Sequence, residues 1–309
     1  MSAANRSFKF MRNRTLAVGM GVLFLAGCNT LDVENPNAPD SKRALADPAA
    51  IEAVAGGTLR SWFNTYDGME GGGPLNTMAR TYSASWNNYN MNFYSSIDAD
   101  GTRNTRAYQN DLASAGRSTM IGYWQGYYSA LSSAVDVLTA IRKNKLVITT
   151  AANTKRAETI AQLMRGASLM GIALNYDKGY VIDENTDLTT LEYKTRKQMR
   201  DAAVASFAEA ATLATANTFT SPSGWTNGTA YTNVQIAQLA RTMSAMTLAY
   251  YPRTPEENTA VDWAAVSALA AGGISSGAKF DFNFTGDGCS SWCHDILYWF
   301  NEFDGGRVS

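Results

Sequence analysis

The apolar residues of this chain recur mostly at helical spacing. In residues 118–138 they lie three and four positions apart, which places them on one face of a helix; they are Trp124, Tyr128, Leu131, Val135 and Leu138. Similar spacing predicts helices over about 152–176, 195–216, 232–251 and 261–271. The expected core stripes in two of these are Met199, Ala203, Phe207, Ala210 and Ala214, and then Ile236, Ala240, Met243, Thr247 and Tyr250.

An earlier helix is expected from Pro48 to about Phe63. Asp47 can cap its free N–H groups, and proline fits the first helical position. Residues 65–117 are instead rich in glycine and asparagine, so we expect long loops there, with one short helix near 74–86.

We therefore predict an all-α fold. Strand-like alternation and a nucleotide-binding fingerprint are both missing from the sequence. We expect antiparallel helix pairs over 118–273, packed as in tetratricopeptide proteins, although no strict 34-residue repeat is visible. Loop-rich insertions are expected over 65–117 and 274–309.

The N-terminus has the pattern of a lipoprotein signal peptide. Four basic residues precede an uncharged stretch from Leu16 to Ala26, which is too short to span a bilayer. The stretch ends in Leu25-Ala26-Gly27-Cys28, the small-small-cysteine sequence at which a lipoprotein peptidase cuts. We expect removal of residues 1–27, lipidation of Cys28, a flexible tether over 28–45 and one helical domain over 46–309. Because Asn29 rather than aspartate follows Cys28, we expect sorting to the outer membrane.

Composition restricts the partners. The chain has 26 basic and 27 acidic residues, and four of the basic ones belong to the predicted signal peptide. The acidic excess that remains argues against nucleic-acid binding, which needs a basic face. Seven Trp and 15 Tyr suit either a tyrosine-rich core or a protein that binds neutral polar ligands on aromatic faces.

The other two cysteines lie close together, in Cys289-Ser-Ser-Trp-Cys293-His294. Outside the cytoplasm, such a pair favours a disulfide. A haem-c attachment site would have one residue fewer between the cysteines, and a zinc site would need further ligands, since His294 is the only histidine. We therefore predict no metal site and no cofactor.

Several segments, taken in order, resemble the SusD/RagB-like outer-membrane lipoproteins. After the lipidated cysteine come Leu31-Asp32-Val33 and Asn35-Pro36-Asn37, and then the run 122–128, Gly-Tyr-Trp-Gln-Gly-Tyr-Tyr. The run 155–179 is similar to the family's Ala-Glu…Arg-Ala…Tyr…Gly helix, and the run 234–241 with Asp262-Trp263 to its later helix pair.

The resemblance implies a function. Members of this family are cell-surface, lipid-tethered lids over a TonB-dependent (SusC-like) outer-membrane transporter. They capture nutrient oligomers, usually glycans and sometimes peptides, and are not enzymes. They are typically much longer than this chain, so we expect a shortened member or a fragment.

Two segments have the composition of a sugar-binding site, where aromatic rings pack on the sugar and short polar side chains bind its hydroxyls. The candidate ligand contacts are Trp86, Asn87, Asn88, Tyr89, Tyr94, Trp292 and Trp299. Packing within loops is the alternative for these aromatic residues, while the helical register of Trp124, Tyr127 and Tyr128 favours the core.

Two other function classes stay open. A helical-repeat scaffold lipoprotein of the cell envelope would bind proteins rather than small ligands. An enzyme or haem carrier would have to use Cys289, Cys293 and His294. Catalysis has little support, because the chain has one histidine for any Ser-His-Asp arrangement.

Overall fold

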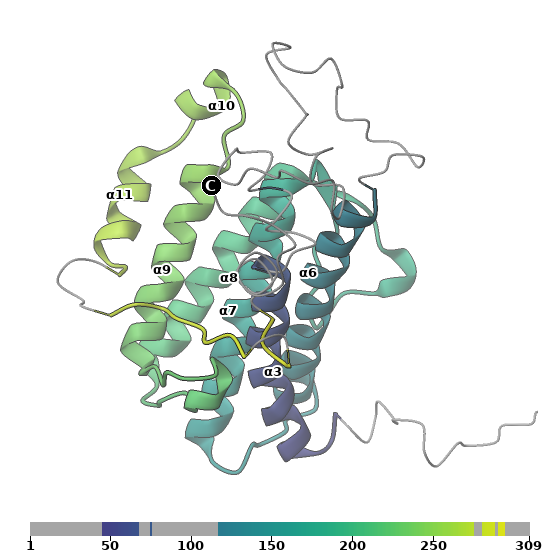
Figure 1. Cartoon of the computed structure of the whole chain (residues 1–309), viewed down its shortest axis with the longest axis vertical. Coiled ribbons are helices and arrows are strands. Elements are labelled where there is room, and N and C mark those ends of the chain that lie inside the picture. Colours follow the sequence, from purple (N-terminus) through teal and green to yellow (C-terminus); the bar gives the residue numbers. More distant parts are fainter. Residues whose placement is uncertain (1–44, 68–74, 76–116, 275–279, 288–289, 294–309) are drawn as a thin grey trace, which may run out of the picture. The chain divides into compact units, whose positions relative to one another are not determined.

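The computed structural model describes residues 45–67, 75, 117–274, 280–287 and 290–293. The chain divides into Met1–Ser41 and Lys42–Ser309, and the described residues all belong to the second unit. This part is mostly helical, as the sequence predicts. The long helices are α3 (Pro48–Tyr66), α6 (Arg117–Leu138), α7 (Ala151–Asn175), α8 (Arg196–Ala216) and α9 (Asn233–Tyr250), shown in Figure 1.

Shorter elements connect them. A π-helical turn, η2 (Thr139–Lys143), extends α6, and the 3-10 turns η3 (Leu188–Thr190) and η4 (Ser223–Trp225) follow α7 and α8. Two short helices, α10 (Pro255–Thr259) and α11 (Trp263–Ala271), come after α9. The strands β1 (Lys178–Gly179) and β2 (Lys194–Thr195) pair antiparallel between α7 and α8.

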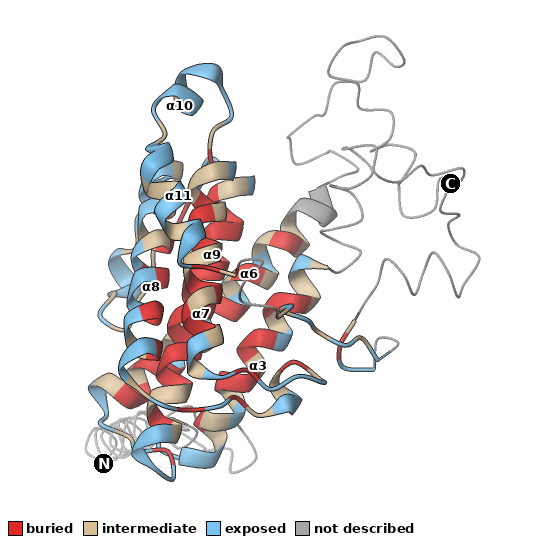
Figure 2. Cartoon of the chain, turned by 90° about the vertical axis from the view of Figure 1, so that its left-hand side faces the viewer, coloured by how far each residue is buried: buried red, intermediate tan, exposed pale blue. Residues whose placement is uncertain are grey.

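Helix α7 is at the centre of the packing. It contacts α3, α6, α8 and α9, whereas α11 packs mainly on α9. Nearly the whole of α7 is buried, as the red ribbon in Figure 2 shows. Small residues permit this close packing, because a Cβ at Gly166 would lie 2.8 Å from the ring of Phe207 on α8.

The helix starts follow from local capping. The Asp47 carboxylate accepts a hydrogen bond from the N–H of Ala49 at 2.9 Å, with Pro48 in the first turn, as predicted. Thr195 and Thr232 form capping boxes with Gln198 and Gln235, a Thr-x-x-Gln signal that our sequence reasoning had not used. All five of these side chains cap helix N-termini.

The predicted core stripes are confirmed in part. All five expected residues of α8 are buried. Tyr250 of α9 was expected in the core but is 63% exposed, because α9 ends there and no neighbouring helix covers that side chain. In α6 the expected core residues Leu131 and Leu138 are buried. Trp124 and Tyr128 are only half-buried, whereas the neighbouring Tyr123 and Tyr127 are buried.

An extended segment crosses back towards α3; we call residues 280–287 and 290–293 the C-terminal strap. Its phenylalanines Phe280, Phe282 and Phe284 pack against the core while the residues between them are exposed. The Asn64 side chain of α3 fixes its far end, since Nδ2 donates to Ser291 O at 3.0 Å and Oδ1 accepts from Cys293 N at 2.9 Å.

Within the described residues, no helix has both the length and the apolar character that crossing a membrane would require. The predicted signal peptide, the tether and most of the insertion 65–117 lie outside those residues.

Candidate functional site

Most of the residues singled out in the sequence fall outside the described part of the structure. They are Cys28, Trp86, Asn87, Asn88, Tyr89, Tyr94, Cys289 and Trp299. Trp292 is described and is only 6% exposed. Its ring lies 5.9 Å from Phe63 and 5.8 Å from Phe284, so the strap uses this side chain for packing against α3.

Cys293 is disulfide-bonded, and its partner lies outside the described residues. His294 lies there too, so the structure does not test the arrangement of these three side chains. Among the residues that are described, no three histidine, cysteine or acidic side chains gather as a metal site would require.

The structure brings together aromatic residues that the sequence keeps apart; we call Trp124, Tyr128, Tyr176, Tyr180 and Tyr193 the aromatic surface. The pairing of β1 with β2 sets Lys178 opposite Thr195 and Gly179 opposite Lys194. The next position in this register places Tyr180 opposite Tyr193, whose rings stack 4.4 Å apart at 19°. Tyr193 is 60% exposed, so one face of this pair is open to solvent.

Tyr128 of α6 holds the backbone of Tyr180 in place. The hydroxyl of Tyr128 accepts a hydrogen bond from the N–H of Tyr180 at 2.5 Å and donates to its carbonyl oxygen at 3.2 Å. Burial raises the pKa of Tyr128 to about 12, so this hydroxyl stays protonated and keeps both bonds at neutral pH. Trp124 packs edge-on against Tyr176, with ring centroids 5.0 Å apart, and 6.3 Å from Tyr180.

This arrangement provides a rigid, partly exposed aromatic face with hydroxyl groups at its rim. The hydrogen bond to Tyr193 raises the pKa of Tyr180, so its hydroxyl also stays protonated. Such a face can pack against the C–H side of a sugar ring, and a preformed face loses little entropy when it binds. Sequence reasoning missed Tyr180 and Tyr193, because only the two-residue ladder brings them together.

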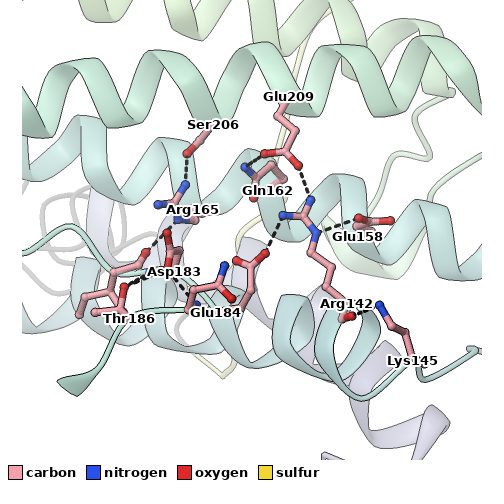
Figure 3. Close-up of polar contacts among 12 residues, drawn as sticks. Arg142, Lys145, Glu158, Gln162, Arg165, Asp183, Glu184, Thr186, Ser206 and Glu209 are labelled. Carbon is pink, nitrogen blue, oxygen red and sulfur yellow. Dashed lines mark hydrogen bonds and ion pairs between the residues drawn. The ribbon is translucent and has the colours of Figure 1, made fainter. Parts of the chain in front are cut away.

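A partly buried polar cluster includes Glu184 of the connection between α7 and α8, residues 176–195 (Figure 3). Arg142 of η2 donates to three carboxylates: Glu158 of α7 at 2.8 Å, Glu184 at 3.0 Å and Glu209 of α8 at 2.5 Å. Burial alone would raise the pKa of Glu158, but hydrogen bonds from Lys155 and Arg142 outweigh it and hold that pKa below its usual value. Arg142 thus links three elements around a single guanidinium group.

Arg165 of α7 joins Ile182 of this connection to Ser206 of α8. Its guanidinium donates to Ile182 O at 2.8 Å and to Ser206 Oγ at 2.6 Å. Burial lowers the pKa of Arg165, and the nearby Asp183 carboxylate opposes that shift. Glu158 and Arg165 therefore have a structural role here.

The cluster does not have the form of an acid–base site. The carboxylates of Glu158, Glu184 and Glu209 all form ion pairs with Arg142. The cluster fixes Ile182 to α7 and Glu184 to η2, and both residues belong to the connection that carries Tyr180 and Tyr193.

Comparison with known proteins adds no assignment. No family model, no curated protein and no solved structure matches this chain. The aromatic surface and the sequence pattern therefore carry the functional argument.

Proposed function

We propose that this protein is a SusD-like cell-surface lipoprotein that binds nutrient oligomers and delivers them to a TonB-dependent outer-membrane transporter. A glycan is the favoured ligand and a peptide the alternative. The protein is not an enzyme in this proposal, and it needs no cofactor. The membrane anchor and the transporter rest on the Cys28 signal and on the ordered family-like segments.

The packing of the helices supports the likeness to tetratricopeptide proteins that this proposal includes. In such proteins the first helix of each pair contacts its own partner and the first helix of the next pair. If α3–α6, α7–α8 and α9–α11 are taken as pairs, α3 contacts α7 and α7 contacts α9 in that way.

The single structural observation that supports an oligosaccharide ligand is the solvent-exposed face of the Tyr180–Tyr193 pair. Tyrosine side chains with this much exposed ring, stacked in parallel and fixed by Tyr128, suit a flat partner with alternating C–H groups and hydroxyls. An oligosaccharide has that chemistry, whereas a protein scaffold would not require a rigid ring pair at this place.

The test is binding of the purified protein to a panel of oligosaccharides and peptides, measured by calorimetry and by the fluorescence of Trp124. We expect Tyr193→Ala to weaken oligomer binding about tenfold, because one stacking face is lost. Tyr250→Ala is the matched control, since Tyr250 is similarly exposed on α9 and should not affect binding.

Co-purification with a TonB-dependent transporter from native membranes is the second arm. Absence of both oligomer binding and transporter association would refute the proposal. Association with envelope proteins alone would favour the helical-repeat scaffold instead.

A further inference from the structure

The ladder that forms the Tyr180–Tyr193 pair also determines which side chains share its exposed face. Alternate residues of a strand point to the same side, and opposite residues of paired strands share that side. Lys178, Tyr180, Tyr193 and Thr195 therefore lie on one face, and Gly179 and Lys194 on the other. The burial agrees, since Gly179 is buried while Lys178 and Tyr193 are exposed.

Lys178 is the only charged residue on that face, and no carboxylate neutralises it among the residues that the structure describes. The acidic side chains next to the two strands, Asp177 before β1 and Glu192 before β2, have other partners. Asp177 accepts a hydrogen bond from Arg253 at 2.6 Å, and Glu192 lies 3.9 Å from the ammonium of Lys194. An exposed ring pair and an unpaired ammonium group thus stand side by side on a rigid support.

We propose that this face is a subsite for an acidic sugar residue, such as a uronate within an oligosaccharide. The sugar ring packs on Tyr193, and the carboxylate of the sugar pairs with Lys178. This inference rests on the proposed function. It adds that the ligand is negatively charged and that Lys178 binds its carboxylate. Neutral sugars would use the ring pair alone and leave the ammonium unpaired.

The probes are oligogalacturonate and oligoglucuronate, each compared with a neutral oligosaccharide of the same length. We expect the full-length protein to prefer an acidic probe, and Lys178→Gln to lower its affinity about tenfold because a charge-assisted hydrogen bond is lost. Affinity for neutral probes should change less than twofold. Lys143→Gln removes a charge from an exposed lysine in η2 and should leave both affinities unchanged.

Ionic strength and a second variant separate charge from fold. Raising salt from about 50 mM to 500 mM should weaken acidic-probe binding in the wild type but not in Lys178→Gln. Lys178→Arg keeps the positive charge and should keep the preference.

Each other outcome has a defined meaning. If neutral oligosaccharides bind as tightly as acidic ones, the acidic subsite is wrong while the proposed function stands. If acidic probes bind but Lys178→Gln binds them equally well, the assignment of Lys178 is wrong. If no saccharide binds, the subsite is refuted, and the proposed function then depends on peptide binding and on the transporter.

Discussion

At the scale of single residues, glycines decide how closely the helices approach. Gly171 of α7 lies against the ring of Tyr127, so a Cβ there would come within 2.6 Å of Tyr127 Cε1. Tyr127 cannot move aside, because it is only 2% exposed and its hydroxyl donates to Tyr123 Oη at 3.0 Å. Gly57 of α3 has the opposite surroundings, with nothing within 4 Å of its Cβ position.

These two glycines form a matched pair for mutation. We expect Gly171→Ala to lower the free energy of unfolding by about 2 kcal/mol, because the core must shift around the added methyl group. Gly57→Ala should raise it by up to about 1 kcal/mol, because alanine favours the helix and meets no neighbour. Urea unfolding of both variants measures this, and equal effects would contradict the packing described.

The surroundings of some residues could be predicted from the sequence, and those of others could not. In the helix predicted over 152–176, Gly171 lies at helical spacing from Met164 and Ala167, so its burial follows from periodicity. The surroundings of Tyr180 and Tyr193 do not, because they depend on a two-residue ladder between segments with no strand pattern. The candidate contacts from Trp86 to Tyr94 were chosen by composition alone and stay a prediction.

At the scale of elements, Arg142 joins η2, α7, α8 and the connection that follows α7. Periodicity predicted the helices, and their bounds agree within a few residues; α10 was missed because it has only five residues. Ion pairs between elements could not be predicted from the sequence. Which charged residues meet depends on how the helices are rotated relative to one another. The π-helical turn that carries Arg142 is an example, because it changes the direction of that side chain.

Removing this arginine should destabilise the fold in a pH-dependent way. We expect Arg142→Met to lower the free energy of unfolding by roughly 2–4 kcal/mol at pH 7, because the buried Glu158 and the partly buried Glu184 lose a partner. The folded-state pKa of Glu158 is lowered, so its contribution is complete above about pH 4.5 and is lost as the pH falls through that pKa. The difference between wild type and variant should therefore narrow below about pH 4.

Denaturant unfolding at several pH values measures the effect. Lys197→Met is the control, since its ion pair with Asp201 is exposed and its loss should cost no more than about 0.5 kcal/mol. A difference for Arg142→Met that does not change with pH would contradict the role given to Glu158.

At the scale of the whole molecule, the predicted lipid anchor would attach the protein to the membrane, and the helical unit would bind the ligand. The anchor is predicted from residues 1–28, and the helical unit supplies the aromatic surface. Two or three acyl chains hold a protein on a membrane far more firmly than one does, so the predicted lipidation of Cys28 would determine where the aromatic surface is located.

Cys28→Ser tests the anchor without touching the helical unit. We expect the variant to lose palmitate labelling and to leave the outer-membrane fraction, while its oligomer binding in solution is unchanged. We expect Asp32 and Glu34, just past Cys28, to form an acidic signal for export to the cell surface. Asp32→Ala with Glu34→Ala should therefore leave the protein lipidated but protected from protease added to whole cells. Membrane association of Cys28→Ser equal to that of wild type would overturn the lipoprotein assignment.

The C-terminal strap has a consequence for how the fold opens. Its hydrogen bonds to Asn64 join positions 227 and 229 residues apart, whereas α6, α7 and α8 contact their neighbours in sequence. Contacts between distant positions are gained late, after the local ones have restricted the chain. The strap is also held by a few side chains rather than by a helix of its own, so it should detach without the helices melting. Amide protons at Asn283 and Thr285 are therefore expected to exchange with deuterium well before those of α7, through an opening that exposes Phe284 to the solvent.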